Sequence, residues 1–407
     1  MASQEAVILG AGITGILTAH ALLEDGWKVT VLDAAHIGAG SSSRTAAGIR
    51  QQFSTPDTVR AMRYCVSFYR SFTERMKCSD TPIVQNGYLF LVDTEEKMAQ
   101  ARRRVAMQQS VGLAEVEALD RDELVRRFPW IEPDAVMGGT WCPTDGFLLP
   151  HIVYHDGAEA TRALGGTIQQ GTLVTGANHS GGRITEVLTN RGSVGADLFL
   201  DCTNAWTRRT GHLLGGSELE VAPLKRYLWF LQREGSLSPQ ALDDMPLTIL
   251  PSGLYVRPEN SDTLLMGRKH DARPDWSFDH DDQDTIDSAF SHNAGLDAAP
   301  FEHWMELAEF VPPVGEFGGI TATSCGYYGT TPDHNPFLDY DPNVDNLIRL
   351  VGFSGHGAML APFTAQVATR LARAGQSVAD LQIEGHAVSL NPFAIGRSHD
   401  VHESLVI

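Results

Sequence analysis

The stretch AVILGAGITGILTAHALLEDGWKVTVLD, residues 6–33, decides the fold. Residues 6–9 form a short apolar run with β-branched members, and residues 28–32 form a second one. Between them, residues 13–25 carry apolar side chains at helical spacing and are followed by Gly26, a common helix-stop residue. Continuous apolar strands of this kind are typical of a buried parallel sheet. The stretch therefore predicts a strand, a helix and a second strand parallel to the first.

Residues 10–15, GAGITG, connect the first strand to the helix and fit the pattern G-x-G-x-x-G. In this pattern the first glycine permits a tight turn, the second lets the backbone approach a pyrophosphate, and the third lets helix and strand pack closely. The helix N-terminus offers unpaired N–H groups and a partial positive charge to the phosphates. Asp33 ends the second strand, where a carboxylate accepts hydrogen bonds from ribose hydroxyls. Together these features indicate a dinucleotide site rather than an ordinary glycine-rich turn.

A second glycine-rich loop, GFSGHG at 352–357, lies between a predicted strand at 347–352 and a predicted helix at 359–374. The first motif alone does not distinguish NAD from FAD. Its position at the N-terminus, the Gly/Ser-rich stretch at 37–43 and the second loop favour FAD, because N–H groups of such a loop can meet the electron-rich edge of a flavin. The alternative for the second loop is a helix start that serves packing only.

The rest of the chain alternates helical and strand-like segments without an internal repeat. The acidic stretch 279–287 is expected to open a helix, and the segment after Asn391 is expected to be a loosely held tail. The pattern predicts an α/β nucleotide-binding domain assembled from discontinuous pieces, with a mostly antiparallel insert. Further helices are predicted at 56–77, 95–110 and 151–164, and strands at 87–92, 168–175, 183–189, 197–202, 224–232, 247–257 and 263–268.

The charge of the chain narrows the choice of partners. Its 407 residues include 31 Lys and Arg against 50 Asp and Glu, a formal net charge of −19. Such a field repels phosphate backbones, which argues against nucleic acid and against docking on an anionic membrane. No apolar run reaches the ~18 residues of a membrane span, and no basic region precedes the first strand, so neither a membrane segment nor a signal peptide is expected.

Cysteines and histidines indicate no metal or disulfide chemistry. The five cysteines are scattered and include no C-x-x-C pair, which predicts reduced thiols in a cytoplasmic protein. Histidines such as His151, His155, His270 and His280 lack the spacing of metal ligands, so no metal is predicted.

Taken as a whole, the motifs resemble the FAD-dependent oxidoreductases that group D-amino-acid oxidase, glycine oxidase and sarcosine oxidase. The resemblance implies a Rossmann-like FAD-binding domain, at 1–85, 145–220 and 320–390, and a substrate domain built on an antiparallel sheet, at 86–144 and 221–319, with a C-terminal tail at 391–407. It rests on GAGITG at 10–15, Asp33, GSSSRTAAGIRQQF at 40–53, DG at 145–146, DLFLDCTNAW at 197–206, GYYGTTPDHNP at 326–336 and GFSGHGAMLAP at 352–362.

The resemblance also implies which residues contact FAD, from the pyrophosphate and ribose to the flavin ring. The implied cofactor-binding residues are Gly10, Gly12, Ile13, Thr14, Gly15, Asp33, Ala34, Ser42, Ser43, Arg44, Thr45, Ala47, Gly48, Ile49, Val174, Thr203, Asn204, Trp206, Gly355, His356, Gly357, Ala358 and Met359.

Departures from the family pattern concern the cofactor link and the electron acceptor. Thr45 stands where some relatives tether flavin through histidine, and Gly326 stands where others use cysteine. FAD is therefore predicted to bind non-covalently, with a thioether at Cys325, one residue away, as the alternative. Leu265 stands where oxygen-using sarcosine oxidases have a lysine, which argues against a fast reaction with oxygen.

Other departures concern the substrate anchor. Tyr328 replaces the arginine that binds substrate carboxylate in amino-acid oxidases, and Met359 replaces the lysine of sarcosine oxidases. A buried carboxylate without a partner costs several kcal/mol, roughly. Either Arg50 supplies the positive charge or the substrate is not a simple free amino acid.

Four residues are the candidates for contact with substrate. Arg50 is expected to pair with a substrate anion or with reduced flavin, the alternative being a structural ion pair with an acid such as Asp333. His356 is expected either to meet flavin or substrate or to hold its loop. Tyr255 and Tyr328 are expected either as walls of an amine pocket or as core residues.

Three functions follow from these residues. The first is oxidation of a C–N bond in a secondary or N-methylated amine or amino-acid-like substrate, by hydride transfer to flavin N5, with oxygen or another electron acceptor. The second is oxidation of a 2-hydroxy acid, with His356 as the base. The third is a flavoprotein subunit of an electron-transfer complex. The sequence leaves homo- and hetero-oligomers open.

Overall fold

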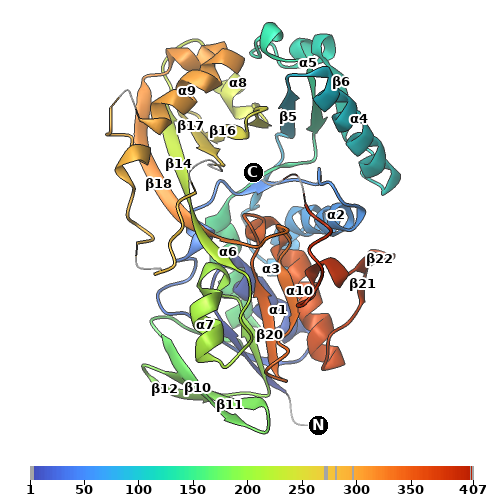
Figure 1. Ribbon diagram of the computed structural model, residues 1–407, viewed down its shortest axis with the longest axis vertical. Helices are drawn as coiled ribbons and strands as arrows, with labels where there is room; N and C mark the ends of the chain where they lie inside the picture. The colour runs from blue at the N-terminus through green and yellow to red at the C-terminus, as the bar shows by residue number, and fades with distance from the viewer. Residues whose placement is uncertain (1–3, 270–273, 280–281, 296–297, 404, 406–407) are drawn as a thin grey trace.

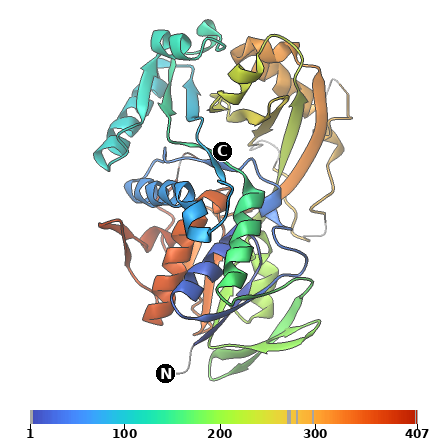
Figure 2. The same ribbon diagram turned by 180° about the vertical axis from the view of Figure 1, so that it is seen from behind.

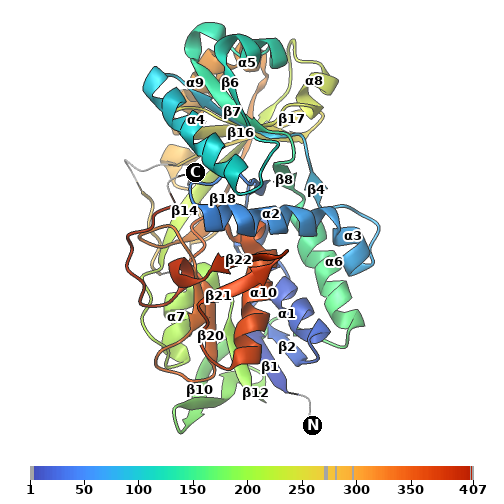
Figure 3. The same cartoon turned by 90° about the vertical axis from the view of Figure 1, so that its right-hand side faces the viewer.

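The protein is described by a computed structural model at residues 4–269, 274–279, 282–295, 298–403 and 405. Figure 1 shows two halves stacked along the long axis, each built around its own large sheet. Helix α2 (Pro56–Arg70) crosses between the halves, as Figure 3 shows from the side. The chain passes from one half to the other several times, so residues distant in sequence meet where the halves join.

The lower half contains the predicted parallel sheet. Its six strands run in the order β19-β20-β13-β1-β2-β9, and all neighbours are parallel except β19 and β20. The strand, helix and strand predicted from residues 6–33 are confirmed. The strands are β1 (Glu5–Leu9), β2 (Lys28–Leu32), β9 (Thr167–Gln169), β13 (Leu198–Asp201), β19 (Phe337–Tyr340) and β20 (Leu347–Val351).

Alternation along β1 explains why both faces of this sheet are covered. Ala6 and Ile8 pack into one hydrophobic cluster with helices α1, α6 and α10, and Val7 and Leu9 pack into another. Figure 2, from behind, shows α6 beside α1. The covering elements are α1 (Ile13–Glu24), α6 (Pro150–Ala163), α7 (Thr207–Leu213), α10 (Gly357–Ala374) and the small sheet of β10 (Val174–Ser180), β11 (Arg183–Thr189) and β12 (Gly192–Gly195).

The upper half is built on an eight-stranded sheet in the order β18-β14-β17-β16-β15-β5-β7-β6. Its pairs are antiparallel except β15 with β5, which confirms the predicted antiparallel sheet. Its strands are β5 (Tyr88–Val92), β6 (Glu117–Asp120), β7 (Gly138–Cys142), β14 (Ala222–Gln232), β15 (Leu247–Ile249), β16 (Leu254–Asn260), β17 (Thr263–Arg268) and β18 (Gly319–Thr330), with helices α4 (Glu95–Ser110), α5 (Arg121–Arg127), α8 (Pro239–Asp243) and α9 (Ala299–Phe310).

Short elements complete the chain, and none of the described helices is long and apolar enough to cross a bilayer. They are α3 (Phe72–Met76), β3 (Gly48–Ile49), β4 (Ile83–Val84), β8 (Gly146–Leu148), β21 (Asp380–Ile383), β22 (His386–Ser389) and 3-10 helices at Ser41–Ser43, Pro133–Ala135, Asn204–Trp206, Ser288–Phe290, Pro312–Glu316 and Asn391–Phe393.

Several predicted elements differ in extent. The predicted helix 56–77 is two helices, because the chain leaves helical geometry at Ser71. The predicted strand 168–175 is two strands separated by a turn in which Gly171 has φ +63°.

Two expectations about the C-terminal third were wrong. The acidic stretch 279–287 opens no α-helix in its described part, 279 and 282–287, and leads only into a short 3-10 helix. Residues 280–281 lie outside the described residues. The described part of the tail after Asn391 is not loosely held, because Arg397 forms a paired hydrogen bond with Asp333 and Glu403 is 2% exposed.

Candidate functional site

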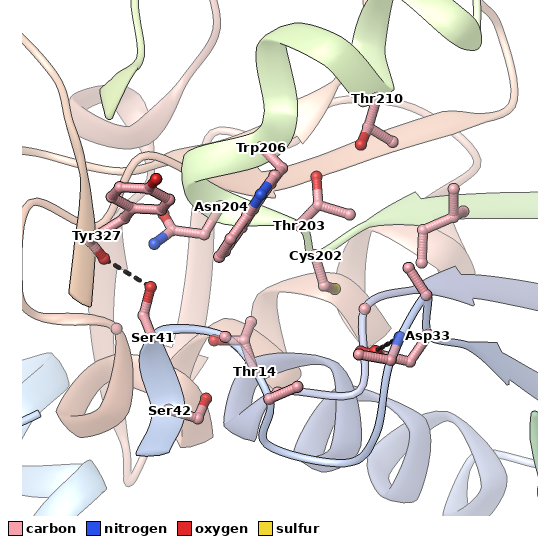
Figure 4. A pocket seen from close by; sticks show the side chains of 18 of the residues that line it. Thr14, Asp33, Ser41, Ser42, Cys202, Thr203, Asn204, Trp206, Thr210 and Tyr327 are labelled. Atoms are coloured by element: carbon pink, nitrogen blue, oxygen red, sulfur yellow. Dashed lines mark hydrogen bonds between the residues drawn. The ribbon is translucent and has the colours of Figure 1, made fainter. Parts of the chain in front are cut away.

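A cavity of about 550 Å³ opens at the carboxyl ends of β1, β2 and β13, a volume in the usual range for ligand sites. Figure 4 shows side chains from both halves around it. Of the predicted cofactor residues, those that line it are Gly10, Gly12, Ile13, Thr14, Asp33, Ala34, Ser42, Arg44, Thr45, Val174, Thr203, Asn204, Trp206, Gly355, Gly357 and Ala358.

The turn before α1 is closely packed at all three glycines. A Cβ on Gly10, whose φ is +102°, would lie 2.9 Å from the Cys202 carbonyl oxygen, and a Cβ on Gly15 would lie 1.9 Å from the Gly10 oxygen. A Cβ on Gly12 would lie 2.9 Å from Ser42 Oγ, which accepts a hydrogen bond of 3.0 Å from the Ile13 N–H. No side chain therefore fits at any of the three positions without moving the turn or its neighbours, and Gly10 and Gly12 also line the cavity.

Asp33 is fixed at the opposite side of this turn. Its carboxylate accepts hydrogen bonds from the N–H groups of Ala11, at 2.7 Å, and Ala35, at 2.8 Å. Figure 4 labels Asp33 at its place in the cavity. Each carboxylate oxygen retains acceptor capacity for a further donor. Helix N-terminus, glycine-rich turn and acceptor carboxylate together fit the phosphates and ribose of a dinucleotide.

Arg44 borders the same cavity and is paired with an acid from the upper half. Its Nη2 lies 2.7 Å from Asp284 Oδ1, and both residues line the cavity. A guanidinium at this place is available to a phosphate, because an arginine can contact more than one acceptor.

Asn204 links the strand end of β13 to the second glycine-rich loop. It adopts φ +48°, a conformation that asparagine tolerates better than most residues. Its side-chain oxygen accepts hydrogen bonds from the N–H groups of Gly352, at 3.0 Å, and Phe353, at 3.2 Å. The asparagine therefore ties the two walls of the cavity together.

A second, smaller cavity of about 40 Å³ adjoins the first and shares Thr45, Tyr328, Gly355 and Ala358 with it. All four candidates for substrate contact meet here. The cavity is lined by Thr45, Ala46, Ala47, Gly48, Arg50, Tyr88, Leu247, Tyr255, Tyr328, Gly355, His356, Ala358 and Met359.

Arg50 is 1% exposed and held by the main chain. Its Nη1 donates to the Gln52 oxygen at 2.8 Å, its Nη2 donates to the Leu405 oxygen, and its guanidinium lies 4.1 Å from the Phe53 ring centroid. Nε has no hydrogen-bond partner within the described ranges. Asp333 pairs with Arg397 instead, so the alternative ion pair between Arg50 and Asp333 is not formed.

His356 precedes α10 and is buried beside Arg50. Burial holds the pKa of its imidazole well below the usual range, and the positive charge of Arg50 and nearby His334 act in the same direction. The ring meets Phe53 edge-on at 5.3 Å between centroids. His356 therefore presents a neutral imidazole to the small cavity.

Two glycines make room for the tyrosines of this cavity. A Cβ on Gly267 would lie 2.3 Å from the Tyr255 hydroxyl, and one on Gly355 would lie 2.5 Å from the Tyr328 ring. Burial raises the pKa of both phenols, opposed in part by the charge of Arg226, whose Cζ lies 5.3 Å from the Tyr328 ring centroid. Both tyrosines are neutral and can donate a hydrogen bond.

Some predicted residues line neither cavity. Gly15 serves helix packing, Ile49 is fully buried in β3, and the Ser43 hydroxyl faces the Gly40 oxygen at 3.4 Å. Cys325 is also outside both cavities: it donates to the Gln283 oxygen at 3.0 Å, and burial raises the pKa of its thiol. This placement favours non-covalent FAD, which stays a prediction.

Other lining residues escaped the sequence analysis. Tyr88 and Leu247 lie on neighbouring strands β5 and β15 and no motif marks them. Ser41, next to the quoted Ser42, could have been included; its hydroxyl donates to the Tyr327 oxygen at 2.6 Å (Figure 4). No group of three or more His, Cys, Asp or Glu among the described residues could hold a metal ion. Further lining residues of the large cavity include Thr172, Arg209, Thr210, Gln283, Asp284 and Tyr327.

Comparison with known proteins agrees with this geometry. The model of the DAO family, described as FAD dependent oxidoreductase, matches residues 5–371. The FAD-dependent oxidoreductase domain-containing protein 1 of Bos taurus is 27% identical over 97% of this chain and 84% of its own length. Mitochondrial sarcosine dehydrogenase of Mus musculus is 24% identical over 87% of this chain, but over 38% of its own length.

Solved structures show the same fold. L-proline dehydrogenase from P. horikoshii has a TM-score of 0.81 and 26% identity, over 92% of this chain and 94% of that one. Glycine oxidase from Geobacillus kaustophilus has a TM-score of 0.79 and 20% identity, over 97% of this chain and 100% of that one.

Proposed function

The chain belongs to the DAO family of FAD-dependent oxidoreductases, and on that premise we propose that it oxidises a C–N bond in a small secondary or N-methylated amino acid. Arg50 is the observation that carries the proposal: it brings a buried positive charge to the small cavity, and its Nε has no hydrogen-bond partner among the described residues. Asp145 is a buried acid whose carboxyl feels the charge of Arg50. A substrate carboxylate would give Arg50 a further charged partner inside the cavity.

The size of the small cavity supports a small substrate. Its volume is about 40 Å³, whereas a cavity of roughly 10–15 Å³ holds one water molecule. The small cavity shares part of its lining with the large one. A compact amino acid held at Arg50 would therefore lie next to a cofactor bound in the large cavity.

The chain's own residues select the reactive form of the amine. When bound, FAD supplies the acceptor for a hydride from the carbon next to nitrogen. His356 and the two tyrosines are neutral, and Met359 and Ala47 are apolar, so the cavity places no counter-charge beside an ammonium group. Desolvation lowers an amine's pKa, so the bound amine gives up its proton and keeps a free electron pair. Arg50 orients the substrate, and the iminium product is hydrolysed by water.

The relatives support this substrate class. Sarcosine dehydrogenase and L-proline dehydrogenase are named for amino acids whose nitrogen carries a second carbon substituent. Both names also specify a dehydrogenase. Leu265, where the resemblance places the lysine of oxygen-using relatives, is 2% exposed in β17 and offers no charge to oxygen.

Anaerobic mixing of the holoenzyme with a panel of sarcosine, proline, glycine and lactate tests the proposal. We expect sarcosine or proline to bleach the flavin absorbance. Arg50→Met should weaken the apparent Kd of that substrate by roughly 10–100-fold, the loss of one charge-assisted hydrogen bond. Arg162→Met, on the outer face of α6, is the matched control and should leave binding unchanged. Absence of bleaching by every amine would refute the proposal.

A neutral His356 also favours one alternative, oxidation of a 2-hydroxy acid, because a neutral imidazole can accept the hydroxyl proton. His356→Asn discriminates between the two. It should abolish flavin reduction by lactate-like substrates if the alternative holds, but only slow reduction by an amine, which needs no protein base.

A further inference from the structure

The C-terminal segment turns back onto the loop that carries Arg50. Arg397 binds Asp333 through Nε, at 2.6 Å, and Nη2, at 2.9 Å. Asn335 donates to the Val401 oxygen at 2.8 Å, and the Glu403 N–H donates to the Asp333 oxygen at 3.3 Å. These contacts place the segment beside the turn at 331–335.

Glu403 then joins the segment to the loop that follows Arg50. Its carboxylate accepts hydrogen bonds from the Ser54 N–H, at 3.1 and 3.2 Å, from the Ser54 hydroxyl, at 2.7 Å, and from the Leu405 N–H, at 3.0 Å. The nearby cation is Arg104 of α4, where the charge of Glu403 opposes the lowering of the arginine pKa by burial. With these partners a buried carboxylate holds its neighbours in one arrangement.

Leu405 connects Glu403 to the guanidinium of Arg50, because its N–H contacts the first and its oxygen the second. Its oxygen accepts from Arg50 Nη2, while the Gln52 oxygen accepts from Nη1 and the Phe53 ring packs on the guanidinium. Two of the three nitrogens are thus fixed by main-chain oxygens. Because the guanidinium is planar, fixing these two nitrogens fixes the plane of the whole group and with it the directions of the N–H bonds that these contacts leave unused.

We infer that Glu403 is a positioning residue for substrate binding: through Leu405 it orients Arg50 toward the small cavity. The inference deepens the proposed function and rests on it, since it assigns a role to the C-terminal segment at the same anchor. A well-placed donor binds a carboxylate better than a mobile one, because less rotational freedom is lost on binding.

A double-mutant cycle tests this role. The probe is methoxyacetate, in which an ether oxygen replaces the amine nitrogen of N-methylglycine, and its Kd is read from the shift of the flavin absorption of the holoenzyme. Glu403→Ala should weaken the Kd roughly 10-fold in the native background. In an Arg50→Lys background it should have little further effect, because residues that act through one another are non-additive. KM for the amine should rise more than kcat falls.

Controls separate positioning from general damage. Asp400→Ala removes an exposed acid from the same segment and should leave the Kd unchanged. Ser54→Ala removes one hydrogen-bond partner of Glu403 and should weaken the binding of methoxyacetate by less than Glu403→Ala does. If Glu403→Ala folds poorly, Ser54→Ala takes its place in the test of the positioning role. FAD content and Tm are measured for each variant.

The outcomes are distinct. An equal loss in both backgrounds, no loss, or tighter binding on Glu403→Ala would overturn the positioning role while leaving Arg50 as the anchor. If Arg50→Lys alone does not weaken methoxyacetate binding, the anchor itself fails, and the positioning role fails with it.

Discussion

At the scale of single residues, Asn204 carries a strained backbone and two hydrogen bonds. Asn204→Ala leaves the N–H groups of Gly352 and Phe353 without this acceptor and keeps φ at +48°. We expect a loss of roughly 1–3 kcal/mol in the free energy of unfolding and weaker FAD retention. Urea unfolding and flavin release during gel filtration measure the two. Asn204→Asp, which keeps the acceptor, should retain more stability; equal losses would contradict this account.

Asp145 predicts a pH dependence of stability. Burial raises the pKa of its carboxyl to about 6, although Gln51 and Gln52 donate hydrogen bonds to it. In an unfolded chain this pKa is about 3.9, so between roughly pH 4 and 6 the folded state binds more protons. The stability that Asp145 contributes is therefore complete below this window and is lost as pH rises through it.

Asp145→Asn removes this proton uptake. The difference in free energy of unfolding between the native protein and the variant should fall as pH rises from about 4 to about 6. Urea titrations at several pH values measure it, and a difference that stays constant would be inconsistent with the raised pKa.

His356 acts in the opposite sense: its lowered pKa gives stability that is complete above about pH 6.5 and declines in acid.

At the scale of elements, the turn between β1 and α1 has no room for a side chain. A Cβ on Gly15 would lie 1.9 Å from the Gly10 oxygen, a backbone atom that moves only if the turn opens. Gly15→Ala should therefore abolish stable FAD binding. Gly176→Ala is a control for the loss of a glycine elsewhere: like Gly15 it has no positive φ, but the nearest atom to its Cβ position, Leu188 Cδ1, lies at an ordinary contact distance of 3.7 Å. Flavin fluorescence of the purified variants checks both, and retention of flavin by Gly15→Ala would disprove the packing argument.

The elements whose structure is decided by local chemistry could be predicted from the sequence. The first strand, helix and strand and the turn at Gly10 follow from residues within one short stretch. Tyr88 and Leu247 were missed because their place depends on β5 pairing with β15, a contact between distant segments. The tail was misjudged for the same reason: Arg50 and Leu405 are 355 positions apart, and no periodicity signals their contact.

At the scale of the whole molecule, the net charge of −19 opposes anions approaching the site. The screening length falls from about 30 Å at 0.01 M salt to about 10 Å at 0.1 M. Raising the salt over this range should increase the second-order rate of flavin reduction by an anionic substrate and leave that of a zwitterion nearly unchanged. Stopped-flow measurement with an N-methylated monoamino dicarboxylate and with sarcosine compares the two; a fall with the dicarboxylate would contradict long-range repulsion.

The order of whole segments was only partly predictable. The residue limits of the two domains and the cytoplasmic location stay predictions. The chain passes between the two halves at α2 and again between the upper sheet and β8. These passages depend on packing between the halves, and no local signal in the sequence marks them.

The wall common to the two cavities has an evolutionary consequence. Four residues border both cavities: Thr45, Tyr328, Gly355 and Ala358. A substitution at any of them should therefore change cofactor binding together with substrate specificity. Tyr88 and Leu247 border the small space alone. Homologues that evolve a new substrate specificity should therefore differ first at those two positions, where substitutions leave flavin binding intact.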